Sequence, residues 1–111
     1  RLAAVNSVVH VAYTLPRWAD RNGASPMLQA RWDRYSANLE AHEKGHGTVA
    51  MSVAGLLEKE LVGLTDQEDC DKVRSEAARR VDAVMRKGET MQNEYDRITE
   101  HGSTQGAIFP F

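Results

Sequence analysis

The chain has 111 residues, of which 41% are hydrophobic and 27% charged, and its formal net charge is -2. This length suits one domain with a single modest core, so we expect one domain over residues 1–111. The charge balance predicts no nucleic-acid partner, and no apolar run approaches the roughly 18 to 20 residues that a transmembrane segment needs. The single cysteine, Cys70, excludes an internal disulfide framework and a multi-cysteine zinc knuckle.

The first segment, residues 2–15, alternates loosely between apolar and polar positions and is rich in β-branched side chains. That pattern predicts a half-buried β-strand, or the second arm of a hairpin, that stops at Pro16. The chain begins at Arg1 directly on this pattern. Such a start is compatible with the removal of an upstream segment such as a signal peptide.

Two long helices are expected after this strand. Ser25-Pro26 predicts the start of the first, because serine can cap free amides and proline fits the first helical position. A buried stripe with steps of three and four then runs through Leu28, Trp32, Tyr35, Leu39, His42, His46, Val49, Val53, Leu57 and Leu61. Thr65 to Glu68 fits a capping pattern for a second helix, whose apolar seam runs from Cys70 to Tyr95. The prediction is an α+β domain in which an N-terminal strand packs on two long antiparallel helices.

The stretch EAHEKGH places His42 and His46 four residues apart on the buried stripe, with Glu43 between them. Residues four apart on a helix have Cβ atoms roughly 5 to 6 Å apart, so both imidazoles can face one ion. Glu43 is rotated by about 100° from His42, which suits a base rather than a third ligand of the same ion. The pattern predicts a Zn²⁺ site in which Glu43 takes a proton from a zinc-activated water. The alternative is two hydrogen-bonded core histidines beside a solvated glutamate.

Gly45 also lies inside this motif, although glycine costs about 1 kcal/mol relative to alanine in a helix interior. A glycine at such a position indicates that another group approaches the helix closely there.

Catalytic zinc normally has three protein ligands, so one more ligand has to come from outside the histidine pair. We expect His101, because the glycine-rich loop that it begins can fold back toward the first helix. Glu94 and Asp96 are carboxylate alternatives, and His10 ranks below His101. Cys70 is expected too far from the motif, and is interpreted as a buried apolar residue.

Two further residues near the end of the second helix are candidates for the site. Tyr95 is a candidate to stabilise the oxyanion of a tetrahedral intermediate, and Asp96 to orient a ligand histidine through its other ring nitrogen. Tyr95 also fits the apolar seam, and Asp96 also fits a solvated helix end. Counting back from the expected turn places Val84 to Gly88 level with the histidine pair.

Three stretches extend the pattern beyond the histidine motif: WDRYSANLEAHEKGH at residues 32–46, YDRITEHGSTQGAIFP at residues 95–110, and LPRW at residues 15–18. Together they resemble a bacterial family of predicted secreted zinc-dependent proteases, otherwise a domain of unknown function. The resemblance spans most of the chain. It implies a minimal zincin-like domain that is normally exported, periplasmic or secreted, with the histidine pair as ligands and Glu43 as base.

The leading hypothesis is therefore a zinc metallopeptidase in which His42, His46 and His101 bind zinc and Glu43 is the general base. Its peptide or protein substrate is expected to lie along the N-terminal strand. The alternative is a non-catalytic interaction module of the cell envelope with a structural or vestigial metal site. A di-iron site is discarded, because the chain has no second Glu-x-x-His pair.

Overall fold

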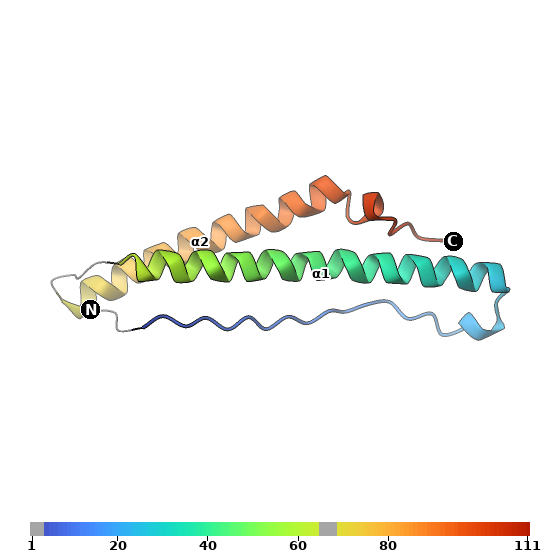
Figure 1. Ribbon diagram of the computed structural model, residues 1–111, viewed down its shortest axis with the longest axis horizontal. Coiled ribbons are helices and arrows are strands. Elements are labelled where there is room, and N and C mark those ends of the chain that lie inside the picture. Colours follow the sequence, from blue (N-terminus) through green and yellow to red (C-terminus); the bar gives the residue numbers. More distant parts are fainter. Residues whose placement is uncertain (1–3, 65–68) are drawn as a thin grey trace. The chain divides into compact units, whose positions relative to one another are not determined.

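The computed structural model describes residues 4–64 and 69–111. In chain order their elements are the 3-10 helix η1 (Arg21–Gly23), the α-helices α1 (Pro26–Val62) and α2 (Cys70–Thr99), and the 3-10 helix η2 (Ser103–Gln105) (Figure 1). The two long helices confirm the prediction. At the start of α1, the Ser25 hydroxyl accepts a hydrogen bond from the Leu28 amide at 3.3 Å, as a capping serine does. The capping pattern predicted at residues 65–68 lies outside the described residues.

The predicted α+β class is wrong, because the described residues contain no β-strand. Residues 4–15 do form an extended segment (Figure 1), and burial alternates along it from Ala4 to His10. A strand, however, also needs a neighbour that pairs with its backbone. No backbone–backbone hydrogen bond joins residues 4–17 to another described segment. The alternating pattern therefore predicted which side chains are covered as far as Val9, but Val11 and Tyr13 are exposed. It did not show whether a sheet partner is present.

The contacts within the chain group it into two compact units. Unit 1 comprises residues 1–10 and 48–92, and unit 2 comprises residues 11–47 and 93–111. Each unit contains a part of the N-terminal segment, a part of α1 and a part of α2.

In unit 1, α1 and α2 pack closely through a glycine. Gly88 is buried, and a Cβ built on it would lie 3.0 Å from both methyl groups of Val53. Arg80 Nη1 donates a hydrogen bond to the Glu60 carbonyl oxygen at 2.8 Å. Val53 of α1 thus contacts Gly88 of α2, whereas Glu60, later in α1, contacts Arg80, earlier in α2. This order confirms the antiparallel arrangement within this unit.

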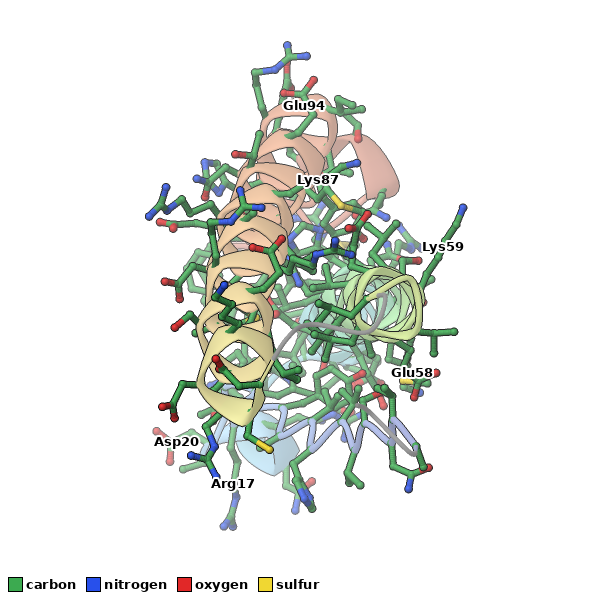
Figure 2. All side chains as sticks on the ribbon, turned by 90° about the vertical axis from the view of Figure 1, so that its left-hand side faces the viewer. Arg17, Asp20, Glu58, Lys59, Lys87 and Glu94 are labelled. Carbon is green, nitrogen blue, oxygen red and sulfur yellow. The ribbon has the colours of Figure 1, made fainter. Side chains whose placement is uncertain are left out.

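In unit 1, one serine of the extended segment forms hydrogen bonds to α1. The Ser7 amide and hydroxyl both donate to Glu58 Oε1, at 3.1 Å and 2.6 Å. Lys59 follows on α1 and is exposed, and Figure 2 shows it projecting away from the helix. Glu58 of α1 thus binds the extended segment, whereas the adjacent Lys59 is exposed to solvent.

In unit 2, an aromatic cluster holds three segments together. It consists of Trp18, Trp32, Tyr35, Phe109 and Phe111. Trp32 is 8% exposed, and its ring stacks on Phe111 with centroids 6.1 Å apart and packs against Trp18 at 5.6 Å. Phe109 meets the edge of Tyr35 at 5.5 Å. The segment before η1 and the segment after η2 are therefore both fixed onto α1.

Cys70 is exposed at the first residue of α2, so its predicted burial is wrong. The buried seam of α2 begins at Val73 instead, one turn further into the helix. Among the described residues, no helix combines the length and the apolar character that crossing a membrane requires.

Candidate metal centre

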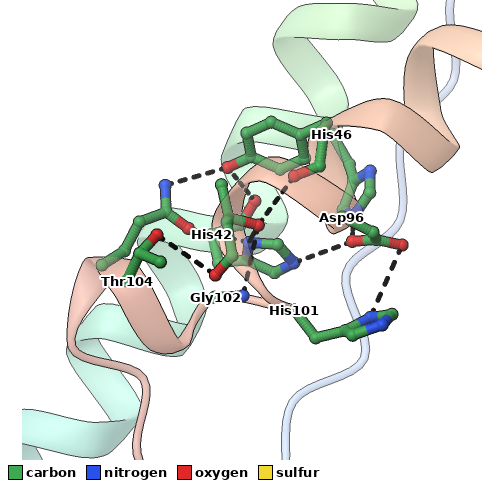
Figure 3. A network of polar contacts seen from close by, with 9 residues as sticks. His42, His46, Asp96, His101, Gly102 and Thr104 are labelled. Carbon is green, nitrogen blue, oxygen red and sulfur yellow. Dashed lines mark hydrogen bonds and ion pairs between the residues drawn. The ribbon is translucent and has the colours of Figure 1, made fainter.

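His42 and His46 lie one turn apart on α1 within unit 2, and their ring centroids are 5.0 Å apart. His42 is 3% exposed and His46 is half-buried. The Nε2 atoms of both rings point toward Oδ1 of Asp96 on α2, at 3.2 Å from His42 and 2.8 Å from His46 (Figure 3). In these three residues, one potential ligand atom each lies within 4.8 Å of the others. The structure thus brings together two imidazole nitrogens and one carboxylate oxygen.

His101 lies next to this cluster. Its Nδ1 atom is 3.9 Å from Oδ2 of Asp96, and its side chain is 84% exposed (Figure 3). It reaches this position because α2 ends at Thr99 and the next three residues have positive φ angles of 50°, 55° and 91°. That conformation turns the chain back at the end of the helix, as the glycine-rich loop predicted. The role of His101 as a ligand stays a prediction.

Glu94 is engaged elsewhere on the surface of α2. Arg97 donates two hydrogen bonds to its carboxylate, and these bonds lower the pKa of Glu94 below its ordinary value. Figure 2 shows Glu94 projecting outward from α2. Of the two carboxylates considered as ligands, Asp96 is therefore the one that faces the histidine pair.

Tyr95 packs against both histidines. Its ring stacks on His42 with centroids 5.0 Å apart and 12° between the planes, and it meets His46 edge-on at 4.7 Å. Its hydroxyl donates to the His42 carbonyl oxygen at 2.9 Å and accepts from Gln105 Nε2 at 3.1 Å. A Cβ built on Gly45 would fall less than 3.0 Å from two atoms of this side chain, so the predicted close approach at Gly45 is confirmed. An oxyanion role for Tyr95 stays a prediction.

The other ring nitrogen of His42 faces the chain after α2. Nδ1 is 2.8 Å from Oε1 of Gln105 and 3.4 Å from the hydroxyl of Thr99, which is 7% exposed. Sequence reasoning assigned no role to Gln105. The sequence did contain a signal, because Gln105 directly precedes a glycine, Gly106. In the structure Gly106 has a φ of 87°, closes η2 and turns the chain back.

Glu43, the predicted base, is half-buried and follows His42 on α1. Within the described ranges it makes neither a hydrogen bond nor an ion pair. Its carboxylate is thus available as a proton acceptor, although its catalytic role stays a prediction.

A groove in unit 1 contains none of the three clustered residues. It has a volume of about 780 Å³, and its lining surface is mainly apolar, with His10 among the lining residues. His10 is therefore a groove residue of unit 1.

In the part of the chain that the structure describes, these features define a small helical protein with a cluster of two histidines and one aspartate, a combination of side chains that can hold a divalent metal. The chain belongs to a family of bacterial proteins of unknown function, DUF922, whose family model matches residues 1–102. No curated protein and no solved structure matches the chain. Family membership thus confirms the bacterial domain of unknown function, while zinc binding and peptide cleavage stay predictions.

Proposed function

We propose that this protein is a zinc-dependent hydrolase, with a peptide or protein as its substrate. The observation that carries the proposal is the convergence of His42 Nε2, His46 Nε2 and an Asp96 carboxylate oxygen within unit 2. Two imidazoles and one carboxylate are a donor set that catalytic zinc uses, with the fourth position open to water. The chemistry of the residues present therefore fits zinc.

His42 and His46 are the ligands from α1, and Asp96 is the third ligand that the geometry favours. Its Oδ1 atom lies within 3.2 Å of both Nε2 atoms, whereas His101 approaches only the second oxygen of Asp96, at 3.9 Å. His101 remains the alternative third ligand.

The proposed reaction needs a proton acceptor near the attacking water. Zinc bound at this cluster supplies Lewis acidity, which lowers the pKa of a water toward roughly 7 and polarises a carbonyl group. Glu43 removes the proton from the attacking water and returns a proton to the leaving amine. Its position next to His42 and its lack of a polar partner among the described residues suit that role. From the resemblance alone, we also propose a periplasmic or secreted location.

The first test is the metal content of the purified protein, measured by elemental mass spectrometry. We expect about one zinc per chain, and loss of that zinc in a His42→Ala, His46→Ala double variant prepared identically. Absence of zinc from the unmodified protein after reconstitution would refute the metal site.

The second test addresses the base with Glu43→Gln, assayed against a peptide library. We expect zinc binding close to that of the unmodified protein and a rate lower by about 10²- to 10⁴-fold. Glu40→Gln is the matched control, because Glu40 is an exposed glutamate on α1 that pairs with Lys44 at 3.2 Å. Full activity of Glu43→Gln would refute the assignment of the base.

One observation favours the alternative, an interaction module with a structural metal site. Asp96 and His101 lie close together, so His42, His46 and these two residues make four candidate protein ligands. A structural zinc site is closed by four protein ligands, whereas a catalytic site keeps one position for water. X-ray absorption spectroscopy of the zinc-loaded protein distinguishes the two, and four protein ligands without water would favour the module.

A further inference from the structure

The hydrogen bonds around Tyr95 fix the positions of several protons, starting from a group that can only accept. The His42 carbonyl oxygen carries no proton, so its 2.9 Å contact requires the Tyr95 hydroxyl to donate. The Tyr95 oxygen is then left with lone pairs for its 3.1 Å contact with Gln105. The amide of Gln105 must therefore present its NH₂ group to Tyr95.

This orientation of the amide places a hydrogen on Nδ1 of His42. With the NH₂ group on Tyr95, the carbonyl oxygen of Gln105 is the atom 2.8 Å from Nδ1 of His42. Because a carbonyl oxygen accepts only, Nδ1 carries the hydrogen.

Thr99 gives the same answer independently. Its hydroxyl donates its single hydrogen to the Tyr95 carbonyl oxygen at 2.8 Å. It can therefore offer only lone pairs to Nδ1 of His42, at 3.4 Å. Within residues 4–64 and 69–111, Nδ1 thus has two acceptors beside it and no donor.

We infer that Gln105 is a positioning residue that holds the hydrogen-bearing Nδ1 of His42 and thereby directs Nε2 toward Asp96. Nε2 lies 3.2 Å from Oδ1 of Asp96, which also only accepts, so a cation or a second proton has to lie between these two atoms. The hydrogen on Nδ1 follows from the hydrogen bonds alone, whereas a zinc ion at Nε2 rests on the proposed function.

The position of Gln105 is itself fixed by the turn that carries it. Asn38 Nδ2 donates to the carbonyl oxygen of Gly106 at 3.0 Å, which ties the end of η2 to α1. Gln105 is exposed, so its substitution opens no buried cavity. Its variants should fold.

The test compares Gln105→Ala and Gln105→Glu with Ser103→Ala, a control in the same 3-10 helix. Its hydroxyl bonds to the exposed Glu100 and to no other side chain among the described residues. The first measurement is the ¹H–¹⁵N spectrum of histidine-labelled, metal-free protein. We expect a hydrogen-bonded Nδ1–H signal of His42 in the unmodified protein and the control. In Gln105→Ala this signal should move upfield or be lost to exchange, because among the described residues the acceptor that remains, Thr99, is 3.4 Å away. Gln105→Glu keeps a close acceptor at Nδ1, so it should retain the signal.

The second measurement is zinc affinity by competition with a chelating dye. Removing a residue that orients a ligand histidine typically weakens metal binding 10- to 100-fold. We expect a loss of that size in Gln105→Ala, and affinity close to the unmodified protein in Gln105→Glu and in the control.

The outcomes separate this inference from the proposed function. An Nδ1 without hydrogen in the unmodified protein, or an unchanged Nδ1–H signal in Gln105→Ala, would overturn the positioning role. An Nδ1–H signal that responds to Gln105→Ala in a protein that binds no zinc would support the positioning role and overturn the proposed function.

Discussion

Replacing Gly45 with alanine tests the packing of the candidate site, because helix propensity and packing predict opposite signs for its effect. In a helix interior, alanine is more favourable than glycine by about 1 kcal/mol. At Gly45, however, the new Cβ would come closer than 3.0 Å to Oη and Cζ of Tyr95, a separation that real Cβ atoms essentially never show. The tyrosine ring therefore has to move.

The cost of moving Tyr95 follows from its contacts. The hydrogen bond to the His42 carbonyl contributes about 0.5 to 1.5 kcal/mol, and the ring contacts with His42 and His46 contribute about 0.5 to 1.5 kcal/mol each. After subtracting the gain in propensity, we expect the free energy of unfolding to fall by about 2 kcal/mol.

The assay is urea denaturation of the variant beside Gly55→Ala. Gly55 is also in α1, but nothing lies within 4 Å of a Cβ built on it, so its substitution should stabilise by about 0.4 to 1 kcal/mol. In a Tyr95→Ala background, where the clash is removed, Gly45→Ala should also stabilise. Equal stabilisation by Gly45→Ala and Gly55→Ala in the unmodified protein would refute the packing of Tyr95 described above.

Two further predictions concern the surface of α2 and the turn after it. Hydrogen bonds, chiefly from Arg79, lower the pKa of Glu76 from 4.5 to about 2. This pairing therefore stabilises the fold above pH 4.5, and its contribution to stability disappears as the pH falls through about 2. A ¹³C NMR titration should show this midpoint, and it should rise toward 4.5 in Arg79→Ala; an unmoved midpoint would contradict the pairing. Gly106→Ala forces an alanine to a φ of 87° with its Cβ 2.6 Å from Asn38 Nδ2, and should destabilise by about 1 to 3 kcal/mol. Gly23→Ala, which meets nothing within 4 Å, is its control in thermal denaturation, and equal melting temperatures would argue against the turn as described.

The helices were predictable because their periodic pattern persists over many turns. Every position of the stripe predicted from Leu28 to Leu61 is buried or half-buried in the structure. Gly45 shows what propensity alone can reveal: an unfavourable residue in a helix predicted a close neighbour, although it did not identify Tyr95 as that neighbour.

The level of α2 along α1 could not be read from the sequence. Counting from a tight turn placed Val84 to Gly88 beside the histidine pair, which is wrong, since Gly88 packs on Val53 and Tyr95 contacts the histidines. The reason lies in the connection between the helices. Arg80, ten residues into α2, contacts Glu60 near the end of α1, so the first turns of α2 run beyond the level at which α1 ends. At 1.5 Å per residue, such an offset shifts every contact along the helix.

The details of the site depend on contacts between segments far apart in the chain, which a periodic pattern does not contain. Asp96 was named as a residue that orients a histidine or as an alternative ligand, and the structure places it between both imidazoles. The chain after α2 was expected to fold back, but Gln105 was not identified, because its role depends on the orientation of a single amide.

The aromatic cluster has a consequence for how the site meets a ligand. Phe109 and Phe111 attach the end of the chain to α1, and the other end of the 103–108 segment continues from α2. A short loop held at both ends has few conformations, so the conformational entropy of placing Gln105 beside His42 is lost during folding and not during binding. If the proposed ion binds to this cluster, it meets an arrangement that is already preorganised, and its affinity is not reduced by the ordering of this loop.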